Sequence, residues 1–117
     1  KDDGFCVITC PDIQEVARFM AEGRLDDPLY VSPGGPISAI DIMYGHSAAI
    51  ERGEVYMAHK TGFNLQLLAK RLNEAGFGQI AGKNNSRTID LWFIATKNMV
   101  DQGIIKALFN TYTKLSA

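Results

Sequence analysis

Hydrophobic and polar positions along the chain predict an alternation of strands and helices. Residues 5–10, FCVITC, are almost wholly apolar, which is typical of a short strand buried on both faces. Pro11 and Asp12 follow this run, and Asp12 with Glu15 forms a residue pair that often starts a helix. Apolar residues then recur at helical spacing as far as Gly23. The pattern therefore predicts a strand that leads directly into a helix.

The next part of the chain, residues 24–60, has no long period. Its first segment, residues 24–36, contains three of the four prolines and two adjacent glycines, so we expect a loop there. A short helix is predicted over residues 37–44, and another turn or two of helix over residues 47–52. The weak alternation at residues 54–60 does not decide between strand and loop.

A longer amphipathic helix begins after Asn64, whose side chain can cap its first turn. Its apolar stripe recurs at i, i+3, i+4 and i+7 and consists of Leu65, Leu68, Ala69 and Leu72. Phe63 can pack on Leu68 as a hydrophobic staple. Gly76 suits the left-handed position that ends many helices, and Phe77 can then fold back on the last turn.

Two strands joined by a hairpin turn are predicted next, at residues 78–83 and 88–96, with the turn at Asn84 and Asn85. The second strand is apolar on both sides, so we expect it inside a helix-covered sheet. A last helix is predicted over residues 101–115, where it covers one face of that sheet. Asn98 or Asp101 is available as its cap.

Composition narrows the class of protein. The chain has 117 residues, 46% of them hydrophobic, and a net charge of −1, so we expect one globular domain, residues 1–117, without a nucleic-acid partner. No apolar run reaches the ~18 residues of a membrane span, and the charged start is no signal peptide. Cys6 and Cys10 would lie roughly 13 Å apart on one strand, too far for a disulfide. Reduced thiols indicate a cytoplasmic protein, and no metal site is predicted because nothing places His46 or His59 near other ligands.

Three motifs resemble one enzyme family. They are LNEAGF at residues 72–77, DLWFIATK at residues 90–97 and DDGFCVITCPD at residues 2–12. Together they look like the carboxyl-terminal part of class I S-adenosylmethionine-dependent methyltransferases. The resemblance implies an α/β fold in which residues 5–10, 88–96 and 78–83 form strands five, seven and six of a partial Rossmann-like sheet, in that spatial order. The hairpin would be antiparallel and helices would flank the sheet.

The same resemblance implies that the cofactor-binding half is missing. The family holds S-adenosylmethionine with a glycine-rich turn after its first strand and an acidic residue at the end of its second, and neither is present here. Gly34 and Gly35 follow no predicted strand, so we interpret them as flexible loop residues. We therefore expect the full-length protein to use S-adenosylmethionine and this fragment alone to bind no cofactor and to be inactive.

By resemblance, substrate-side residues come from the loop after strand five and from the segment before strand six. They are Pro11, Asp12, Tyr44, Gly45, His46, His59 and Lys60. Each has a structural alternative: Asp12 can be a helix cap, His46 can interact with the end of a helix, His59 can be exposed, and Tyr44 can be a packing residue. No catalytic residue is assigned, and the methyl acceptor is unknown.

Two hypotheses about function remain open. In the first, the chain is the substrate-side part of an S-adenosylmethionine-dependent methyltransferase. In the second, it is a small non-catalytic α/β module that acts by association through the exposed edge of residues 5–10. Both predict an assembly, such as a homodimer, that covers this edge.

Overall fold

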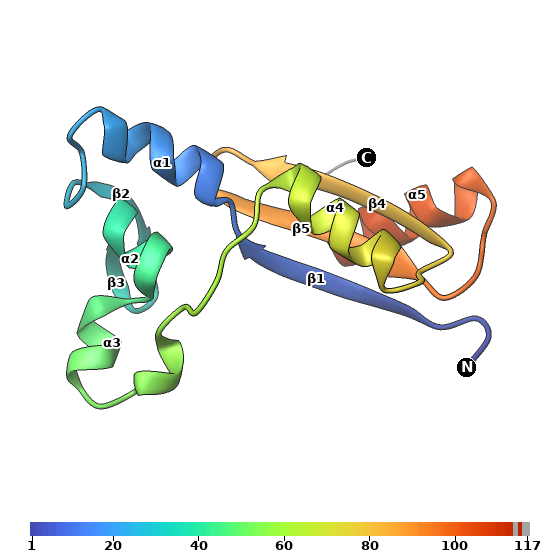
Figure 1. Cartoon of the computed structure of the whole chain (residues 1–117), viewed down its shortest axis with the longest axis horizontal. Helices are drawn as coiled ribbons and strands as arrows, with labels where there is room; N and C mark the ends of the chain where they lie inside the picture. The colour runs from blue at the N-terminus through green and yellow to red at the C-terminus, as the bar shows by residue number, and fades with distance from the viewer. Residues whose placement is uncertain (114, 116–117) are drawn as a thin grey trace.

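The computed structural model describes residues 1–113 and 115 and contains helices and antiparallel strands (Figure 1). The elements in chain order are β1 (Phe5–Pro11), α1 (Ile13–Ala21), β2 (Pro28–Ser32), β3 (Gly35–Ser38), α2 (Ala39–Tyr44), α3 (Ser47–Glu51), the 3-10 helix η1 (Val55–Met57), α4 (Leu65–Glu74), β4 (Gln79–Asn85), β5 (Asp90–Thr96) and α5 (Gln102–Tyr112). β1, β4, β5, α4 and α5 form one half, here called the sheet lobe. α1, β2, β3, α2, α3 and η1 form the small lobe at the other end of the long axis (Figure 1).

The sheet lobe has the strand order that the family resemblance implies. β5 lies in the centre of a three-stranded sheet and pairs antiparallel with β1 on one side and with β4 on the other. Val7 and Ala81 both lie opposite Ile94. Neighbouring residues of a strand point to opposite faces, so each face of the sheet takes alternate residues of all three strands.

Helices cover the two faces of β5. On one face, Leu91 and Phe93 pack against Leu68 and Leu72 of α4. On the other face, Ile94 packs in a second cluster, with Ile105 and Phe109 of α5. The prediction that β5 is buried on both sides is therefore confirmed.

β1 differs from its prediction. Cys10 and Ile8 are partly buried beneath α4, but Phe5 is 39% exposed and Val7 41% exposed on the opposite face. The prediction of burial on both faces is wrong, because α5 packs on β4 and β5. Its Tyr112 ring lies 5.1 Å from the Phe5 ring, between centroids, at the rim of this open face.

The predicted helix ends of the sheet lobe are confirmed. The Asn64 side chain accepts a hydrogen bond from the backbone N–H of Leu67 at 2.8 Å and caps α4. Gly76 follows the helix with a positive φ of 91°, where an L side chain would be strained. Asp101, one of the two predicted caps of α5, accepts from the N–H of Gly103 at 2.7 Å.

The hairpin turn lies later in the chain than predicted. Asn84 and Asn85 are the last residues of β4, and the turn is formed by residues 86–89. The Asn85 side chain accepts from the N–H of Arg87, and Ile89 adopts the positive φ of 58°. Ile89 is only 3% exposed and packs in the core of the small lobe. Its burial explains why a β-branched residue is held in a conformation that normally disfavours it.

The small lobe corrects the prediction of a loop at residues 24–36. β2 and β3 form a two-stranded antiparallel hairpin around a turn at Pro33 and Gly34. Gly35 is the first residue of β3 and has a φ of 113°, so these glycines belong to the turn and the strand that follows it and are not a loose loop. Pro28 and Pro36 lie on a two-stranded ribbon, where each strand has an unpaired edge that tolerates a missing N–H. Residues 37 and 38 belong to β3, so helix α2 starts two residues later than predicted.

The core of the small lobe joins it to the sheet lobe. Its buried members are Val16, Ile37, Ala39, Ile42 and Ile89. Val16 comes from α1 and Ile89 from the β4–β5 turn, so neither β2–β3 nor α2 makes this core alone. No helix in the described part of the chain is long and apolar enough to cross a membrane.

Candidate functional site

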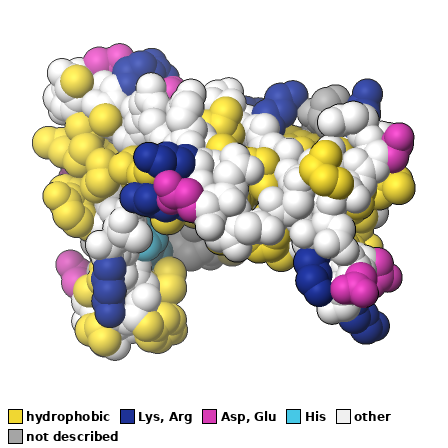
Figure 2. All heavy atoms as spheres, turned by 45° about the vertical axis from the view of Figure 1, so that its right-hand side comes forward, with side chains coloured by type: hydrophobic (Ala, Val, Ile, Leu, Met, Phe, Trp, Pro, Cys, Tyr) yellow, Lys and Arg dark blue, Asp and Glu magenta, His cyan; other side chains and the backbone are white. Residues whose placement is uncertain are grey.

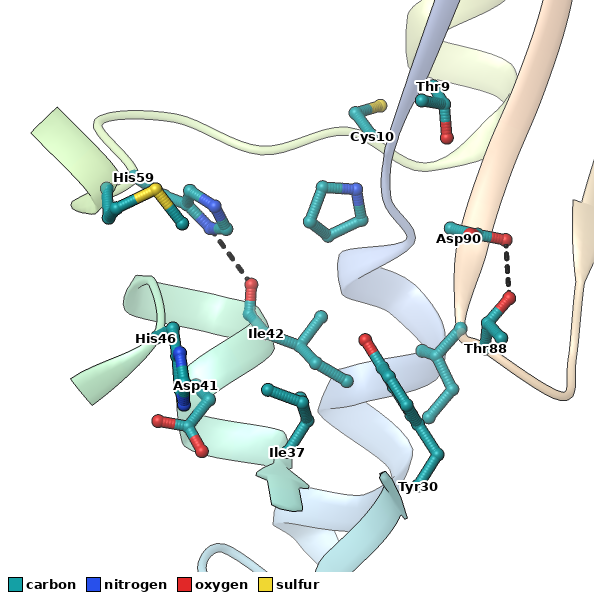
Figure 3. A pocket seen from close by; sticks show the side chains of 13 residues that line it. Thr9, Cys10, Tyr30, Ile37, Asp41, Ile42, His46, His59, Thr88 and Asp90 are labelled. Atoms are coloured by element: carbon teal, nitrogen blue, oxygen red, sulfur yellow. Dashed lines mark hydrogen bonds between the residues drawn. The ribbon is translucent and has the colours of Figure 1, made fainter. Parts of the chain in front are cut away.

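A cavity of about 320 Å³ lies between the two lobes and is here called the interlobe cavity (Figure 3). The sheet lobe contributes the end of β1 and the turn before β5, with residues Thr9, Cys10, Pro11, Thr88, Ile89 and Asp90. The small lobe and the segment after it contribute Tyr30, Ile37, Asp41, Ile42, His46, Met57 and His59. Its volume falls at the lower end of the range of small-molecule sites. Figure 2 shows a histidine side chain in the recess where the lobes meet.

His59 is held by the carboxyl-terminal end of α2. Its backbone N–H donates to the carbonyl of Tyr44 at 3.0 Å, and its ring Nδ1 lies 3.0 Å from the carbonyl oxygen of Ile42 (Figure 3). A carbonyl oxygen can only accept, so Nδ1 must carry the proton. When the ring is neutral, Nε2 is therefore the nitrogen with the lone pair, available to accept a proton or a hydrogen bond.

His46 enters the cavity wall from the start of α3. Its backbone carbonyl accepts from the N–H groups of Ala49 and Ile50, while its side chain makes no capping hydrogen bond. The ring lies against the β2–β3 turn, where a Cβ atom on Gly34 would come 3.4 Å from Cε1. The ring therefore does not interact with the last carbonyls of α2, which was the structural alternative for His46.

Asp41 fixes the two short helices that carry His46. One carboxylate oxygen accepts from the N–H and hydroxyl of Ser47, and the other accepts from the N–H and hydroxyl of Ser38. Partial burial alone would raise the pKa of Asp41, but the hydrogen bonds from Ser47 and Ser38 outweigh it and lower the pKa to about 2. Asp41 is thus an ionised structural carboxylate whose oxygens already have donors.

Two other groups of the wall stay uncharged. Burial raises the pKa of the Tyr30 hydroxyl, and the carboxylates of Asp90 and Asp41 raise it further. Burial likewise raises the pKa of the Cys10 thiol, with contributions from Asp12 and Asp90. A raised thiol pKa lowers the fraction of reactive thiolate, which favours a packing role for Cys10 over a nucleophilic one. Cys6 and Cys10 are both free thiols.

The structure brings most of the predicted site residues together. Pro11, His46 and His59 line the interlobe cavity. Pro11, His59 and Lys60 line a neighbouring cavity of about 400 Å³, and Tyr44, His59 and Lys60 line a third of about 200 Å³. His59 therefore stands where all three cavities meet. Gly45, beside them in the chain, ends α2 with a φ of 108° and packs against the backbone of Met57.

Asp12, like Gly45, is a predicted site residue that lines none of these three cavities. It is 6% exposed, and its carboxylate accepts from the N–H of Gln14 at 3.2 Å as the N-cap of α1. Asp12 therefore has the geometry of a helix cap, which was its structural alternative. Its partner in the predicted capping pair, Glu15, instead forms an ion pair with Arg18.

Sequence reasoning missed Tyr30, Asp41 and the turn residues before β5. Tyr30 was hidden because residues 24–36 gave no strand signal. Asp41 lies three residues after Ser38, which is the spacing of a capping box, and that signal could have found it. No local signal marks Ile89, because its place in the wall depends on the packing of one lobe against the other.

The described residues do not form a cradle for S-adenosylmethionine. Two strands in this part of the chain lead directly into a helix. Between β3 and α2, the N–H groups of Ser38, Ile40 and Asp41 donate to Asp41, Leu25 and Ser38. Between β1 and α1, at Pro11–Asp12, the donors are likewise already used. The N–H of Asp12 donates to the carbonyl of Ile89, that of Ile13 to Phe63, and that of Gln14 to the Asp12 side chain. A cofactor cradle needs free backbone N–H groups at a helix start. No chemical step through the cofactor is therefore placed on these residues.

Across the described residues, no three His, Cys, Asp or Glu side chains come together in a way that could hold a metal ion. Comparison of the chain with protein-family models, with curated proteins and with solved structures found no match.

Proposed function

We propose that this chain is the substrate-side part of a class I S-adenosylmethionine-dependent methyltransferase. The observation that supports this most is the sheet, in which β5 lies antiparallel between β4 and β1 with α4 and α5 on opposite faces. The family resemblance of the three sequence motifs implies this order and this direction. Other α/β folds could place three strands in this way, so the proposal depends on the motifs and the sheet together.

The position of the cavities supports the same proposal. Ligands of open α/β sheets bind outside the carboxyl ends of parallel strands. In the proposed enzyme, β1 is such a strand, and its carboxyl end at Cys10 and Pro11 lines both larger cavities. The methyl acceptor would thus lie between the end of β1 and the small lobe, with the cofactor bound by residues outside this chain.

Two measurements test the proposal. In titration calorimetry, the 117-residue chain is expected to show no binding of S-adenosylmethionine, because no cradle is present; micromolar binding would contradict the assignment of the cofactor to a separate half. The second measurement is the coding sequence before Lys1. A strand followed by a glycine-rich turn is expected there, and a start codon directly before Lys1 would exclude the proposal.

The alternative function is association through the open edge of β1. At its two ends, Gly4 and Asp12 bond to β5, through Lys97 N–H to Gly4 O at 2.9 Å and Asp12 N–H to Ile89 O at 3.1 Å. Successive residues of a strand direct their backbone N–H and C=O groups to opposite sides. Those of Phe5, Val7 and Thr9 therefore point to the free edge of β1. These three residues could pair with the same strand of a second copy in a homodimer.

Light scattering tests the association through this edge, and the coding sequence before Lys1 separates the two functions. The alternative predicts a concentration-dependent homodimer that Val7→Pro converts to a monomer, because proline removes the central edge donor while an edge strand tolerates it. Val7→Thr keeps the N–H and serves as the control. A chain that stays monomeric at high concentration would rule out association through this edge.

A further inference from the structure

The interlobe cavity is apolar over much of its wall. Pro11 and Ile89 come from the sheet lobe, and Ile37, Ile42 and Met57 come from the small lobe. Figure 3 shows Ile37 and Ile42 on the α2 side of the cavity and the end of β1 opposite them. Such walls bind a small molecule by removing its apolar surface from water, and the few polar groups then fix its orientation.

Two polar groups of this wall can each form a hydrogen bond with a ligand. His59 offers Nε2 as an acceptor when its ring is neutral, because the Ile42 carbonyl holds the proton on Nδ1. The Tyr30 hydroxyl points toward the middle of the cavity and makes no hydrogen bond to the described residues. Burial keeps this hydroxyl protonated, so it can donate. A ligand O–H group can donate to Nε2 of His59, and a separate acceptor on a ligand could accept from Tyr30.

The charges of the wall disfavour other ligand classes. Asp41 and Asp90 both act on the Tyr30 hydroxyl, so a ligand carboxylate or phosphate beside it would face two like charges. An ammonium group would need a carboxylate oxygen, but both oxygens of Asp41 already accept two hydrogen bonds from Ser38 or Ser47, and Asp90 accepts from the hydroxyl of Thr88. Lys60 lies in the neighbouring cavities and not in this one.

We propose that the interlobe cavity binds a neutral, mainly apolar molecule with a hydroxyl group, of the phenol class, whose O–H donates to Nε2 of His59. This inference rests on the proposed function, because in a methyltransferase that hydroxyl would be the methyl acceptor. The binding step itself needs neither cofactor nor transfer. It can therefore be tested on this chain alone.

The test is an NMR titration with para-cresol, its methyl ether, para-toluate and para-methylbenzylamine. The chain has two histidines, so imidazole ¹⁵N spectra report each ring directly. We expect His59 to show the Nδ1–H tautomer in its neutral form and Nε2 to shift on addition of para-cresol. One hydrogen bond between neutral groups changes a dissociation constant by about fivefold to tenfold. The cresol should therefore bind tighter than its ether by about that factor.

Variants assign the preference to one of the two polar groups. His59→Asn keeps a donor for the Ile42 carbonyl but removes the ring acceptor, and it should bring cresol and ether to equal affinity. Tyr30→Phe removes the second polar group of the wall and should leave the preference for cresol over its ether in place, because that preference comes from Nε2 of His59. Tyr56→Phe is the matched control, because Tyr56 is 78% exposed, donates to Glu54 and lies outside the cavity.

Each outcome decides the inference. Equal binding of cresol and ether by the folded wild-type chain, or tighter binding of the toluate or the amine, would overturn it. In that case the methyltransferase proposal is still decided by the sequence before Lys1. Selective cresol binding together with a start codon at Lys1 would keep the site and reject the enzyme.

Discussion

The two lobes of this molecule are built on different principles. In the sheet lobe the elements are 7 to 11 residues long, and α4, β5 and α5 carry buried residues at their own period. In the small lobe the elements after α1 have 3 to 6 residues, too few to define a period. Its core is completed by Val16 and by Ile89, which comes from the β4–β5 turn. The small lobe thus depends on the sheet lobe for its core, whereas α4 and α5 cover β5 without it.

The largest expected effect is in the sheet lobe. Phe93→Ala should lower the free energy of unfolding by about 3–5 kcal/mol, because Phe93 is 2% exposed and packs beneath α4. Urea unfolding followed by circular dichroism measures the change. Val31→Ala, at a 76% exposed position, is the control and should change stability by less than about 0.5 kcal/mol. A small lobe that stays folded when the sheet lobe melts would disprove the dependence.

A second substitution acts on the joint between the lobes. Ile89→Ala should cost about 2–4 kcal/mol and raise hydrogen exchange in residues 28–57 more than in β5. Ile89→Gly should be at least as stable as the alanine variant, because a φ of 58° suits glycine and strains alanine. A glycine variant that is clearly weaker than the alanine variant would refute the strained turn. Equal increases of exchange in both lobes would refute the role as a joint.

A third prediction concerns the link between α4 and α1. Asn64→Ala removes the cap of α4 and should cost about 1 kcal/mol. The Asn64 amide also donates to the Gln14 side chain at 2.9 Å, which is an exposed contact. Gln14→Ala breaks only that contact and should cost a few tenths of a kcal/mol. Thermal unfolding measures the stability of both variants. Equal losses of stability would show that the contact with Gln14, and not the cap, stabilises the helix.

The smallest effect is an acid-dependent weakening of the small lobe. The pKa of Asp41 is lowered from 3.8 to about 2, so its ionised form stabilises the fold above about pH 4. That contribution should fade as the pH falls from about 4 to 2, by less than about 1 kcal/mol, since solvent screens the partly exposed group. Asp41→Asn should remove this pH dependence in urea midpoints. An unchanged slope in the variant would show that another carboxylate is responsible.

The candidate site lies where these two kinds of structure meet. Pro11, His46, His59 and Lys60 could be predicted because motif resemblance placed them before and after known strands of a family. Tyr30 and Ile89 could not, because no local pattern shows that a hairpin and a turn 59 positions apart share one wall. The role of Asp12 was also decided by context, since its carboxylate is used by the backbone of α1.

The sequence by itself determined β5, α4 and α5, because long elements with buried stripes have one way to hide their apolar side chains, while the order of the sheet was an implication of the family resemblance. The open face of β1, the β2–β3 hairpin and the positive φ of Ile89 were decided only by the tertiary structure. The local conformational preferences of these residues are weak or oppose the observed backbone. The burial of a few side chains between the lobes was therefore enough to override them.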